Sequence, residues 1–516
     1  MIESSRNVYS LYTKIGALQL LGGLAFFMRT KVGALVLGPA GVGVVSLVEQ
    51  FVQLILQLSA FAIPFAAIKI LSKAHSESAE AFKAVYAVLL RLLLILGGIG
   101  AAVGIVLVIF QPGWVRPSIT AYSPLVAIGL LAVPAMILHG FFRNVPAAAM
   151  QPMTSALWDT ITAGVMATTV TVGILFFREV GYFVGMLTGA VTVSASYYLY
   201  FARCFGLSMT RPVGSAYSLV KNNLPFVKLS FTSYLLAFVT PLALLVVRTT
   251  VLEHLGEATA GFLQALIGIS LAINLLLNPL NGLLLTPLVN RKIPEGEKQL
   301  NAATFHKKLL LALAIVCLPV ILFPDVAVIV LYSLQFQEAA HVLYWFVLSQ
   351  AMQQVVGVYL ALMIGLDLLI AYGAVMVVAP IANAALAIVL VPRLGLAGAG
   401  IAALGSTTLL TLGTLGYLHI WNGFRFDRVC GLGTLLLFGS LAVEGAFVGT
   451  RPSLDIFNFL AKLLVGIATL VLMLPISLDQ DERLALADQL GVARVLGFVG
   501  YRRQGEHRIG KRKDRL

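Results

Sequence analysis

Charged residues are scarce in this chain, at 11% of 516 residues, whereas a soluble globular protein carries about 25%. Hydrophobic residues make up 59%, and long apolar runs recur along the whole length. Water cannot solvate such a surface, so lipid must be the solvent for most of it. These runs leave no room for a soluble domain of typical size. The composition therefore predicts an all-α polytopic membrane protein.

The chain also lacks the residue patterns of an enzyme site or a metal site. Its three cysteines, Cys204, Cys317 and Cys430, are widely spaced and imply no disulfide framework. No nucleophile–base constellation, phosphate-cradling loop or Cys/His metal spacing occurs. The net charge of +13 resides in short loops beside the apolar runs and near the C-terminus, which is typical of membrane topology signals. We therefore expect no cofactor and no nucleic-acid partner.

Apolar runs long enough to cross a bilayer occur about fourteen times. The first follows Lys14; it is too long for a signal peptide and has no cleavage site, so we interpret it as an uncleaved span. An even number puts both termini on one side, and a cytoplasmic location for that side puts most Lys and Arg in cytoplasmic loops. The sequence thus predicts a multi-pass inner-membrane protein with both termini cytoplasmic. The expected spans are 12–37, 40–66, 85–110, 121–142, 154–177, 182–202, 229–247, 258–288, 309–331, 341–363, 370–391, 397–420, 430–449 and 456–476.

A weak internal duplication runs through the chain. The pattern L-G-x-A-x-x-G occurs at 37–43 and again at 255–261, about 218 positions later. Six spans separate the two copies, and because six is even the repeats are parallel. This arrangement predicts two six-helix lobes related by a pseudo-twofold axis along the membrane normal, with a central cavity between them. Further echoes at a similar offset pair 178–185 with 393–398 and 110–112 with 323–324.

The repeat sets the expected domain boundaries. An N-lobe of six spans would occupy 1–221 and a C-lobe of six spans 222–428, and 429–477 would add two further helices. Residues 478–516 then turn polar, amphipathic and finally basic. This last pattern predicts a cytoplasmic interfacial helix with a basic tail on anionic lipid.

Basic residues inside the predicted spans are costly, so each is a candidate for function. Arg29 and Lys31 lie in the first span, about 10–13 Å along the helix from its outer end. Arg248 ends the seventh span, near the repeat-equivalent position of Arg29. An Arg guanidinium binds diphosphate through a planar fork, and Lys adds a point charge. We expect these residues to form a cationic wall that binds substrate; snorkelling to the headgroups is the alternative.

Polar residues inside two spans are further substrate-binding candidates. Glu49, Gln53 and Gln57 recur every four residues and form a stripe on one face of the second span. The stripe could line a wet cavity, bind sugar hydroxyls or host a coupling proton; interhelical hydrogen bonding is the alternative. Asn274 and Asn278 lie along the eighth span, and the proline after Asn278 suggests a broken helix beside a cavity.

Two other features are expected to be structural. Arg143 and Asp159, in the fourth and fifth spans, can simply pair with each other. Gly181, Gly185 and Gly189 make a small-residue face on the sixth span, which lets a neighbouring helix approach closely.

Short motifs along much of the chain carry a resemblance to a known family. They are Lys14-Ile15-Gly16, Arg29 with Lys31, the 37–43 turn, the 323–340 stretch and the run at 392–402. Together they resemble the bacterial O-antigen and related polysaccharide flippases. These proteins belong to the multidrug/oligosaccharidyl-lipid/polysaccharide (MOP) exporter superfamily.

The resemblance implies two six-helix lobes, often with two extra helices, around a cationic lumen. It implies alternating-access transport of undecaprenyl-diphosphate-linked oligosaccharide from the cytoplasmic to the outer leaflet, with possible coupling to a proton or sodium gradient. Partners would be this lipid-linked oligosaccharide, membrane lipid, a polysaccharide polymerase and glycosyltransferases. Arg29 stands at a place similar to a lumenal arginine of lipid II flippases in the same superfamily.

Other functions remain open at this stage. A lipid II flippase or a multidrug antiporter of the same superfamily is the first alternative, although an antiporter is expected to place acids in its lumen. An integral-membrane glycosyltransferase or O-antigen polymerase is the second. Such enzymes need substantial external loops, and the expected outer loops here are short.

Overall fold

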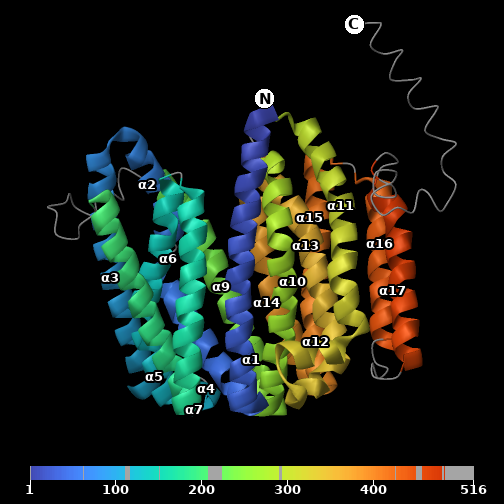
Figure 1. Ribbon diagram of the computed structural model, residues 1–516, viewed down its shortest axis with the longest axis horizontal. Coiled ribbons are helices and arrows are strands. Elements are labelled where there is room, and N and C mark those ends of the chain that lie inside the picture. The colour runs from blue at the N-terminus through green and yellow to red at the C-terminus, as the bar shows by residue number, and fades with distance from the viewer. Residues whose placement is uncertain are drawn as a thin grey trace, which may run out of the picture.

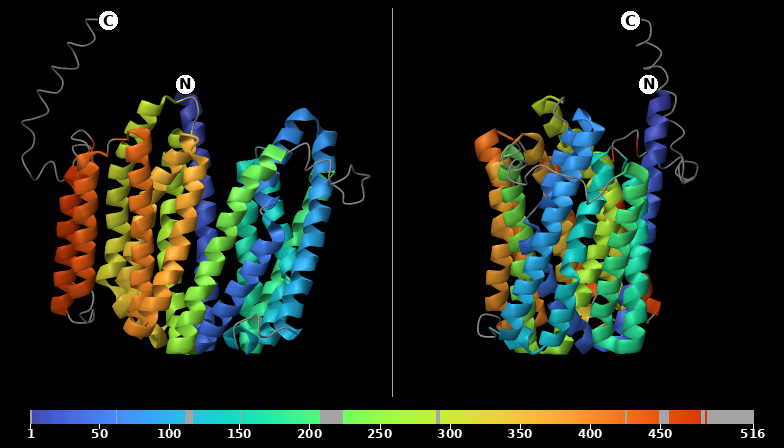
Figure 2. Two further views of the ribbon diagram at one scale, coloured as in Figure 1. Left: turned by 180° about the vertical axis from the view of Figure 1, so that it is seen from behind. Right: turned by 90° about the vertical axis from the view of Figure 1, so that its left-hand side faces the viewer.

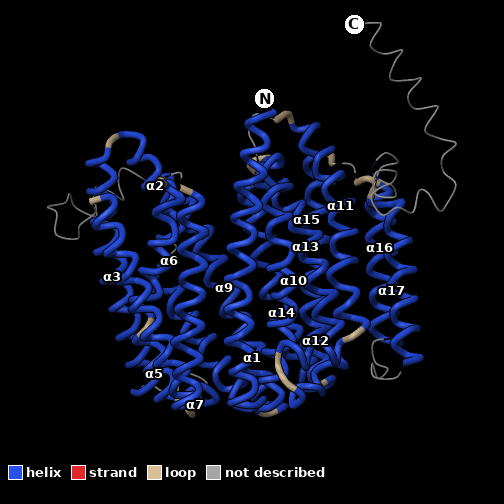
Figure 3. The backbone as a smooth tube through the Cα atoms, viewed as in Figure 1, coloured by secondary structure: helices blue, strands red, loops and turns tan. Residues whose placement is uncertain are grey.

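The computed structural model describes residues 2–61, 63–110, 117–149, 151–206, 224–289, 293–424, 426–448, 456–478 and 482. Every element within them is helical and no strand occurs there (Figure 3), so the predicted all-α class is confirmed. The helices are α1 Ile2–Ala60, α2 Ile63–Glu77, α3 Ala79–Phe110, α4 Pro117–Thr120, α5 Ser123–Leu131, α6 Val133–Ala148, α7 Pro152–Phe205, α9 Leu224–Leu255, α10 Glu257–Val289, α11 Glu295–Leu322, α12 Pro324–Leu331, the 3₁₀ helix η2 Leu334–Val342, α13 Leu343–Gly365, α14 Leu369–Leu394, α15 Leu396–Asn422, α16 Arg428–Val443, the π-helical turn η3 Glu444–Val448 and α17 Ile456–Ser477.

Twelve stretches of the described residues are long and apolar enough to cross a membrane. Two of them, at Lys14–Ala60 and Met153–Cys204, contain 47 and 52 residues. A straight helix of that length would extend ~70 Å, more than twice the ~30 Å hydrocarbon core. Both are interrupted by non-helical backbone, at Gly38 in α1 and at Phe177 and Arg178 in α7. Each therefore supplies two passages, in agreement with the predicted number of about fourteen.

The two arms of α7 pack against each other through the predicted glycine face. A Cβ added to Gly181 would lie 1.8 Å from the Gly173 carbonyl oxygen, and one added to Gly185 would lie 2.4 Å from the Thr169 carbonyl oxygen. No side chain fits at either position, so the backbones are in direct contact. The small-residue prediction is confirmed, and the neighbouring helix is the preceding arm of α7 itself.

The second lobe repeats this local geometry. Gly398, about 217 positions after Gly181, faces the Leu390 carbonyl oxygen, which lies 2.4 Å from a Cβ added to Gly398. Leu390 follows Gly173 by the same offset. The first turns of the two lobes also correspond, because Gly38 and Gly256 both adopt positive φ, at 68° and 84°. The structure thus contains the predicted pair of parallel repeats.

The two lobes meet at a seam formed by both copies of the L-G-x-A-x-x-G turn. A Cβ on Gly43 would lie 2.1 Å from the Glu257 carbonyl oxygen, and a Cβ on Gly261 would lie 1.9 Å from the Pro39 carbonyl oxygen. Pro39 and Glu257 occupy equivalent repeat positions, so the contact is reciprocal, as a twofold relation requires. We call these four residues the seam; it lies at the end of the molecule opposite the N-terminus (Figure 1).

Polar contacts reinforce the junction beside the seam. The Ser118 hydroxyl on α4 donates to the Glu253 carboxylate of α9 at 3.0 Å. The Tyr122 hydroxyl, just before α5, donates to the Glu257 carboxylate of α10. Both hydrogen bonds join an element of the first lobe to one of the second. Toward the N-terminal end the ribbons of the two groups diverge (Figures 1 and 2).

The last two long helices pack on the outside of the second lobe against α11 (Figure 2). The buried His306 ring of α11 hydrogen-bonds the Tyr359 hydroxyl of α13 at 2.5 Å and the Thr434 hydroxyl of α16 at 2.9 Å. The Lys307 ammonium pairs with the Asp427 carboxylate at 2.7 Å, at the start of α16. Hydrogen bonding to Lys307 lowers the pKa of Asp427 below its usual value. These contacts attach the two additional helices to the repeat.

One structural expectation is wrong. The proline after Asn278 was expected to break the eighth span, but α10 runs helically from Glu257 to Val289. A proline removes only one backbone donor, and a membrane helix tolerates this loss when neighbouring groups compensate. The predicted amphipathic helix and basic tail of 478–516 lie outside the described residues, except for 478 and 482.

The seam predicts a stability effect for Gly261→Ala. The added methyl would clash with the Pro39 carbonyl oxygen, and overpacking of this kind costs about 1–3 kcal/mol. We expect a lower midpoint of thermal unfolding for the purified protein in detergent. Gly164→Ala is the matched control, because a Cβ there meets nothing within 4 Å. Equal midpoints for the two variants would contradict the close packing at the seam.

Candidate functional site

Three cavities adjoin one another between and within the lobes, and Leu271 of α10 lines all of them. The central cavity has a volume of about 210 Å³ and is bounded mainly by the two arms of α1, by α7 and by α10. The N-lobe cavity, about 670 Å³, lies among α1, α6, α7 and α10. The C-lobe cavity, about 290 Å³, lies among α9, α10, α13, α14 and α15. The candidate site therefore consists of three chambers with different linings.

The turn at Gly38 brings Arg29 and Glu49 to the same cavity. Arg29 precedes the turn by about nine residues, or ~13 Å, and Glu49 follows it by about eleven residues, or ~16 Å. Both side chains line the central cavity together with Tyr182 of α7 and Tyr332, which follows α12. Residues far apart in sequence thus reach a common depth because two helical arms start from one turn.

Arg29 is held among aromatic rings. Its guanidinium carbon lies 5.1 Å from the centre of the Phe26 ring and 5.8 Å from that of the Tyr182 ring. Both distances fall within the range of cation–π attraction. The Tyr182 hydroxyl in turn donates a hydrogen bond to the Glu49 carboxylate at 2.9 Å. The ring of Tyr182 therefore connects the cation to the acid of the cavity.

Arg248 supplies a second, more deeply buried cation. It is 6% exposed, and its Nη2 donates to the Gln264 side-chain oxygen at 2.5 Å. Its Nε and Nη1 have no hydrogen-bond partner among the described residues. A buried donor left without a partner costs free energy, more so when it is charged. Arg248 thus retains two donors that an added acceptor could satisfy, since none of the described residues satisfies them.

The two arginines share their electrostatic surroundings. Glu49, Tyr182 and Tyr332 each interact electrostatically with both Arg29 and Arg248. One carboxylate faces two guanidinium groups, so this cluster carries net positive charge. The prediction that Arg29 and Arg248 are near-equivalent in the repeat agrees with their shared neighbours.

Lys31 does not join this cluster. Its ammonium donates to the Ile329 carbonyl oxygen, in the last turn of α12, where a cation is favourable because of the helix dipole. Residues two apart on a helix point about 200° apart, so Arg29 and Lys31 cannot face one cavity. The structure therefore places Lys31 in a contact between helices instead of beside Arg29.

The other predicted polar residues are distributed differently. Gln53 and Gln57 continue the stripe of Glu49 away from the turn, and neither lines any of the three cavities. Asn274 lines the N-lobe cavity, and its side-chain oxygen accepts hydrogen bonds from Gln350, at 2.9 Å, and Gln354. Asn278 lies in α10 outside the residues whose side chains are described.

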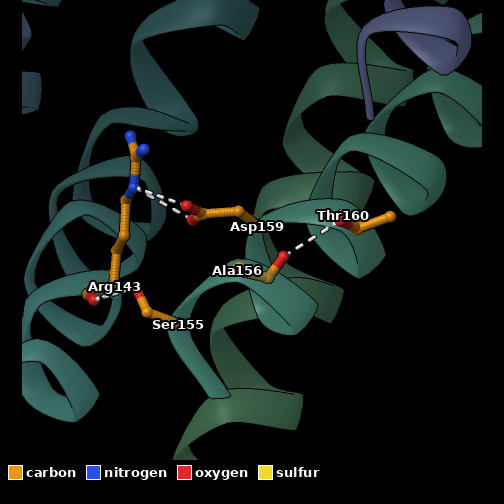
Figure 4. A network of polar contacts seen from close by, with 5 residues as sticks. All are labelled: Arg143, Ser155, Ala156, Asp159 and Thr160. Atoms are coloured by element: carbon orange, nitrogen blue, oxygen red, sulfur yellow. Dashed lines mark hydrogen bonds and ion pairs between the residues drawn. The ribbon is translucent and has the colours of Figure 1, made fainter. Parts of the chain in front are cut away.

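The N-lobe cavity contains the predicted ion pair. Arg143 Nε of α6 lies 2.9 Å and 3.1 Å from the two carboxylate oxygens of Asp159 on α7 (Figure 4), so the predicted pairing is confirmed. The terminal nitrogens of Arg143 point away from Asp159. The Ser155 hydroxyl also donates to the Arg143 carbonyl oxygen at 3.4 Å. This chamber is polar, but its charges balance.

Sequence reasoning missed Tyr182, Tyr332 and Gln264 as members of the central cavity. For Tyr182 and Tyr332 the sequence offered one indication, their position beside a recognised motif. Tyr182 follows the first glycine of the small-residue face, and Tyr332 lies in the 323–340 stretch. Among the described residues, no group of three or more His, Cys, Asp and Glu side chains is placed to hold a metal ion.

A scan of protein-family models and a search of curated proteins each gave no match. Solved structures do match. The lipid II flippase MurJ in an inward closed conformation gives a TM-score of 0.61 at 14% identity, covering 88% of this chain and 98% of that one. A multidrug resistance MATE family transporter of the MOP superfamily in its inward-facing conformation gives 0.64 at 16% identity, covering 79% and 96%. The chain therefore has the fold of membrane transporters of the MOP superfamily.

Proposed function

We propose that this chain is a flippase for undecaprenyl-diphosphate-linked oligosaccharide, the repeat unit of O-antigen or a related polysaccharide. It would move this substrate from the cytoplasmic to the outer leaflet of the bacterial inner membrane. The observation that carries the proposal is a pair of arginines at the junction of the lobes: Arg29 lines the central cavity, and Arg248 lies beside it, bonded to Gln264 of its lining. Fold alone does not choose among the substrates of this superfamily, whereas the positive charge at this site supports an anionic substrate over a cationic one.

A diphosphate suits the unmatched donors beside the central cavity. Arg248 has two N–H groups that no described residue meets, and Arg binds phosphate oxygens in bidentate fashion. Tyr182 and Tyr332 line the cavity next to it. Glu49 offsets part of the positive charge, so an anion can leave again after crossing. A cationic drug would be repelled here, which makes a multidrug antiporter the weaker candidate.

The arrangement of the lobes supports alternating access. They meet at the seam, at the end opposite the N-terminus, and the central cavity lies on the N-terminal side of it. With both termini cytoplasmic, as we propose, this conformation is closed toward the outer leaflet. Release to that leaflet then requires the seam and the hydrogen bonds of Ser118 and Tyr122 to separate.

Energy coupling and partners complete the proposal. A proton or sodium gradient would drive the cycle, and Glu49 is the carboxylate of the central cavity on which a proton would act. The substrate would come from glycosyltransferases on the cytoplasmic side and pass to a polysaccharide polymerase on the other. A lipid II flippase carries the same diphosphate chemistry and is separated from our proposal only by the glycan.

Reconstituted liposomes test the arginine pair. We expect Arg29→Ala and Arg248→Ala each to lower the rate of flipping of undecaprenyl-diphosphate-linked oligosaccharide by at least ~10-fold, equivalent to about 1.4 kcal/mol. Arg393→Ala is the control, because this exposed cation at the end of α14 lies outside the cavities. Native flipping by both arginine variants would contradict the proposal, and flipping of lipid II alone would support the lipid II flippase instead.

Glu49→Gln tests the charge balance. The variant keeps an acceptor for the Tyr182 hydroxyl but removes the negative charge that offsets the arginines. We expect tighter binding of a soluble short-chain prenyl diphosphate, by ~5-fold or about 1 kcal/mol, measured by calorimetry on the purified protein. We also expect its flipping rate to be insensitive to an imposed proton gradient. Weaker binding would instead show that the carboxylate contacts the substrate directly.

A further inference from the structure

The C-lobe cavity differs from the other two because no charged side chain lines it. Its polar lining consists only of hydroxyl and amide groups. Hydroxyls come from Thr240, Ser270, Ser349, Ser406 and Thr407, and amides from Gln350, Gln353 and Asn383. A metal or organic cation would find no carboxylate there to balance its charge. The lining therefore suits an uncharged ligand that both donates and accepts hydrogen bonds.

Two hydroxyls and one amide oxygen of the cavity are left as hydrogen-bond acceptors. The hydroxyls of Ser270 and Ser406 already donate to carbonyl oxygens of their own helices, each at 2.8 Å, so their remaining capacity is to accept. The Asn383 side-chain oxygen is enclosed and has no hydrogen-bond partner among the described residues. An enclosed acceptor without a donor is costly. Hydroxyl-rich ligands supply donors of this kind, and apolar walls such as Phe346 and Met376 suit the C–H faces of a ring.

Position connects this cavity to the diphosphate site. Val247, which lines the C-lobe cavity, directly precedes Arg248, and Leu271 lines both the C-lobe and central cavities. In a lipid-linked glycan the first sugar is bonded directly to the diphosphate. A sugar site must therefore adjoin the phosphate site, and this cavity does.

Size restricts what the cavity accepts. Its volume of about 290 Å³ is at the lower end of the ~300–1,000 Å³ range of ligand pockets. One sugar ring fits that space, whereas a whole oligosaccharide does not. The amide contact from Gln350 to Asn274 lies at its boundary with the N-lobe cavity, where further sugars have more room.

We infer that the C-lobe cavity binds one uncharged sugar ring of the substrate, the ring bonded to the diphosphate. The inference rests on the proposed flippase function and assigns the choice of this sugar to residues other than the two arginines. Asn383 is the residue we expect to contact the ring, because its oxygen is an enclosed acceptor that no described residue matches.

Asn383→Leu tests the site, since the substitution nearly preserves volume and removes the amide. We expect it to lower flipping of the glycan-bearing lipid at least fivefold and to leave flipping of bare undecaprenyl diphosphate unchanged. Arg248→Ala lowers both. Thr408→Val is the control, because Thr408 bonds only its own helix, at Leu404, and lines none of the cavities. An equal effect of Asn383→Leu on both lipids, or none on either, would overturn the inference while leaving a diphosphate flippase intact.

Direct binding tests the site without transport. We expect free neutral hexoses or N-acetylhexosamines at millimolar concentration to raise the unfolding midpoint of the native protein by a few degrees, and not that of Asn383→Leu. This readout remains decisive even where the native chain flips neither lipid and the flippase proposal itself fails. Absence of sugar stabilisation overturns the inference, as does stabilisation by sodium over potassium that Asn383→Leu abolishes, which would indicate a cation site.

Discussion

The close approach of two glycine turns at the seam determines where everything else in the molecule lies. Gly43 and Gly261 leave no room for a side chain against the opposing backbone, so the two repeats start from one shared point. Helices rise by a fixed amount per residue, and residues at similar distances from that point reach similar depths. Because of this shared starting point, and not because of the local sequence, Arg29, Glu49 and Arg248 become neighbours.

Positive charges clustered inside a membrane protein require neighbouring groups that stabilise them. Among the described residues such groups satisfy only part of this cluster. Aromatic rings and one carboxylate lie around Arg29, while Arg248 keeps two donors that no described residue meets. A fully paired cluster would hold the lobes together and bind nothing. The missing acceptor is therefore the feature that separates a binding site from a structural salt bridge, since unmet charge inside a span is retained only where an external group or water meets it.

Three features could be predicted because they depend on spacing along the chain: the repeats, the number of spans, and the near equivalence of Arg29 and Arg248. The Arg143–Asp159 pair could be predicted because both residues were ionisable groups in neighbouring spans. Prediction failed where orientation around a helix decides: Lys31 is about 200° from Arg29 and bonds the end of α12 instead. Tyr182 and Tyr332 were missed because their partners lie on helices far away in sequence, and tyrosine in a span gives no charge signal.

Under the proposed function, the central cavity would supply affinity for the substrate and the two side cavities would supply selectivity. Every polyprenyl-diphosphate substrate carries the same anionic group, so a cationic centre binds all of them and distinguishes none. Discrimination among these substrates requires side chains that contact the sugar, because the sugar is the part that differs. A site built to hydrogen-bond a hydroxyl rejects an analogue that lacks it. The neutral C-lobe cavity and the charge-balanced N-lobe cavity provide such groups on either side of the arginines. Under the proposed function, a change of glycan would therefore require substitutions in the side chambers and none at the two arginines.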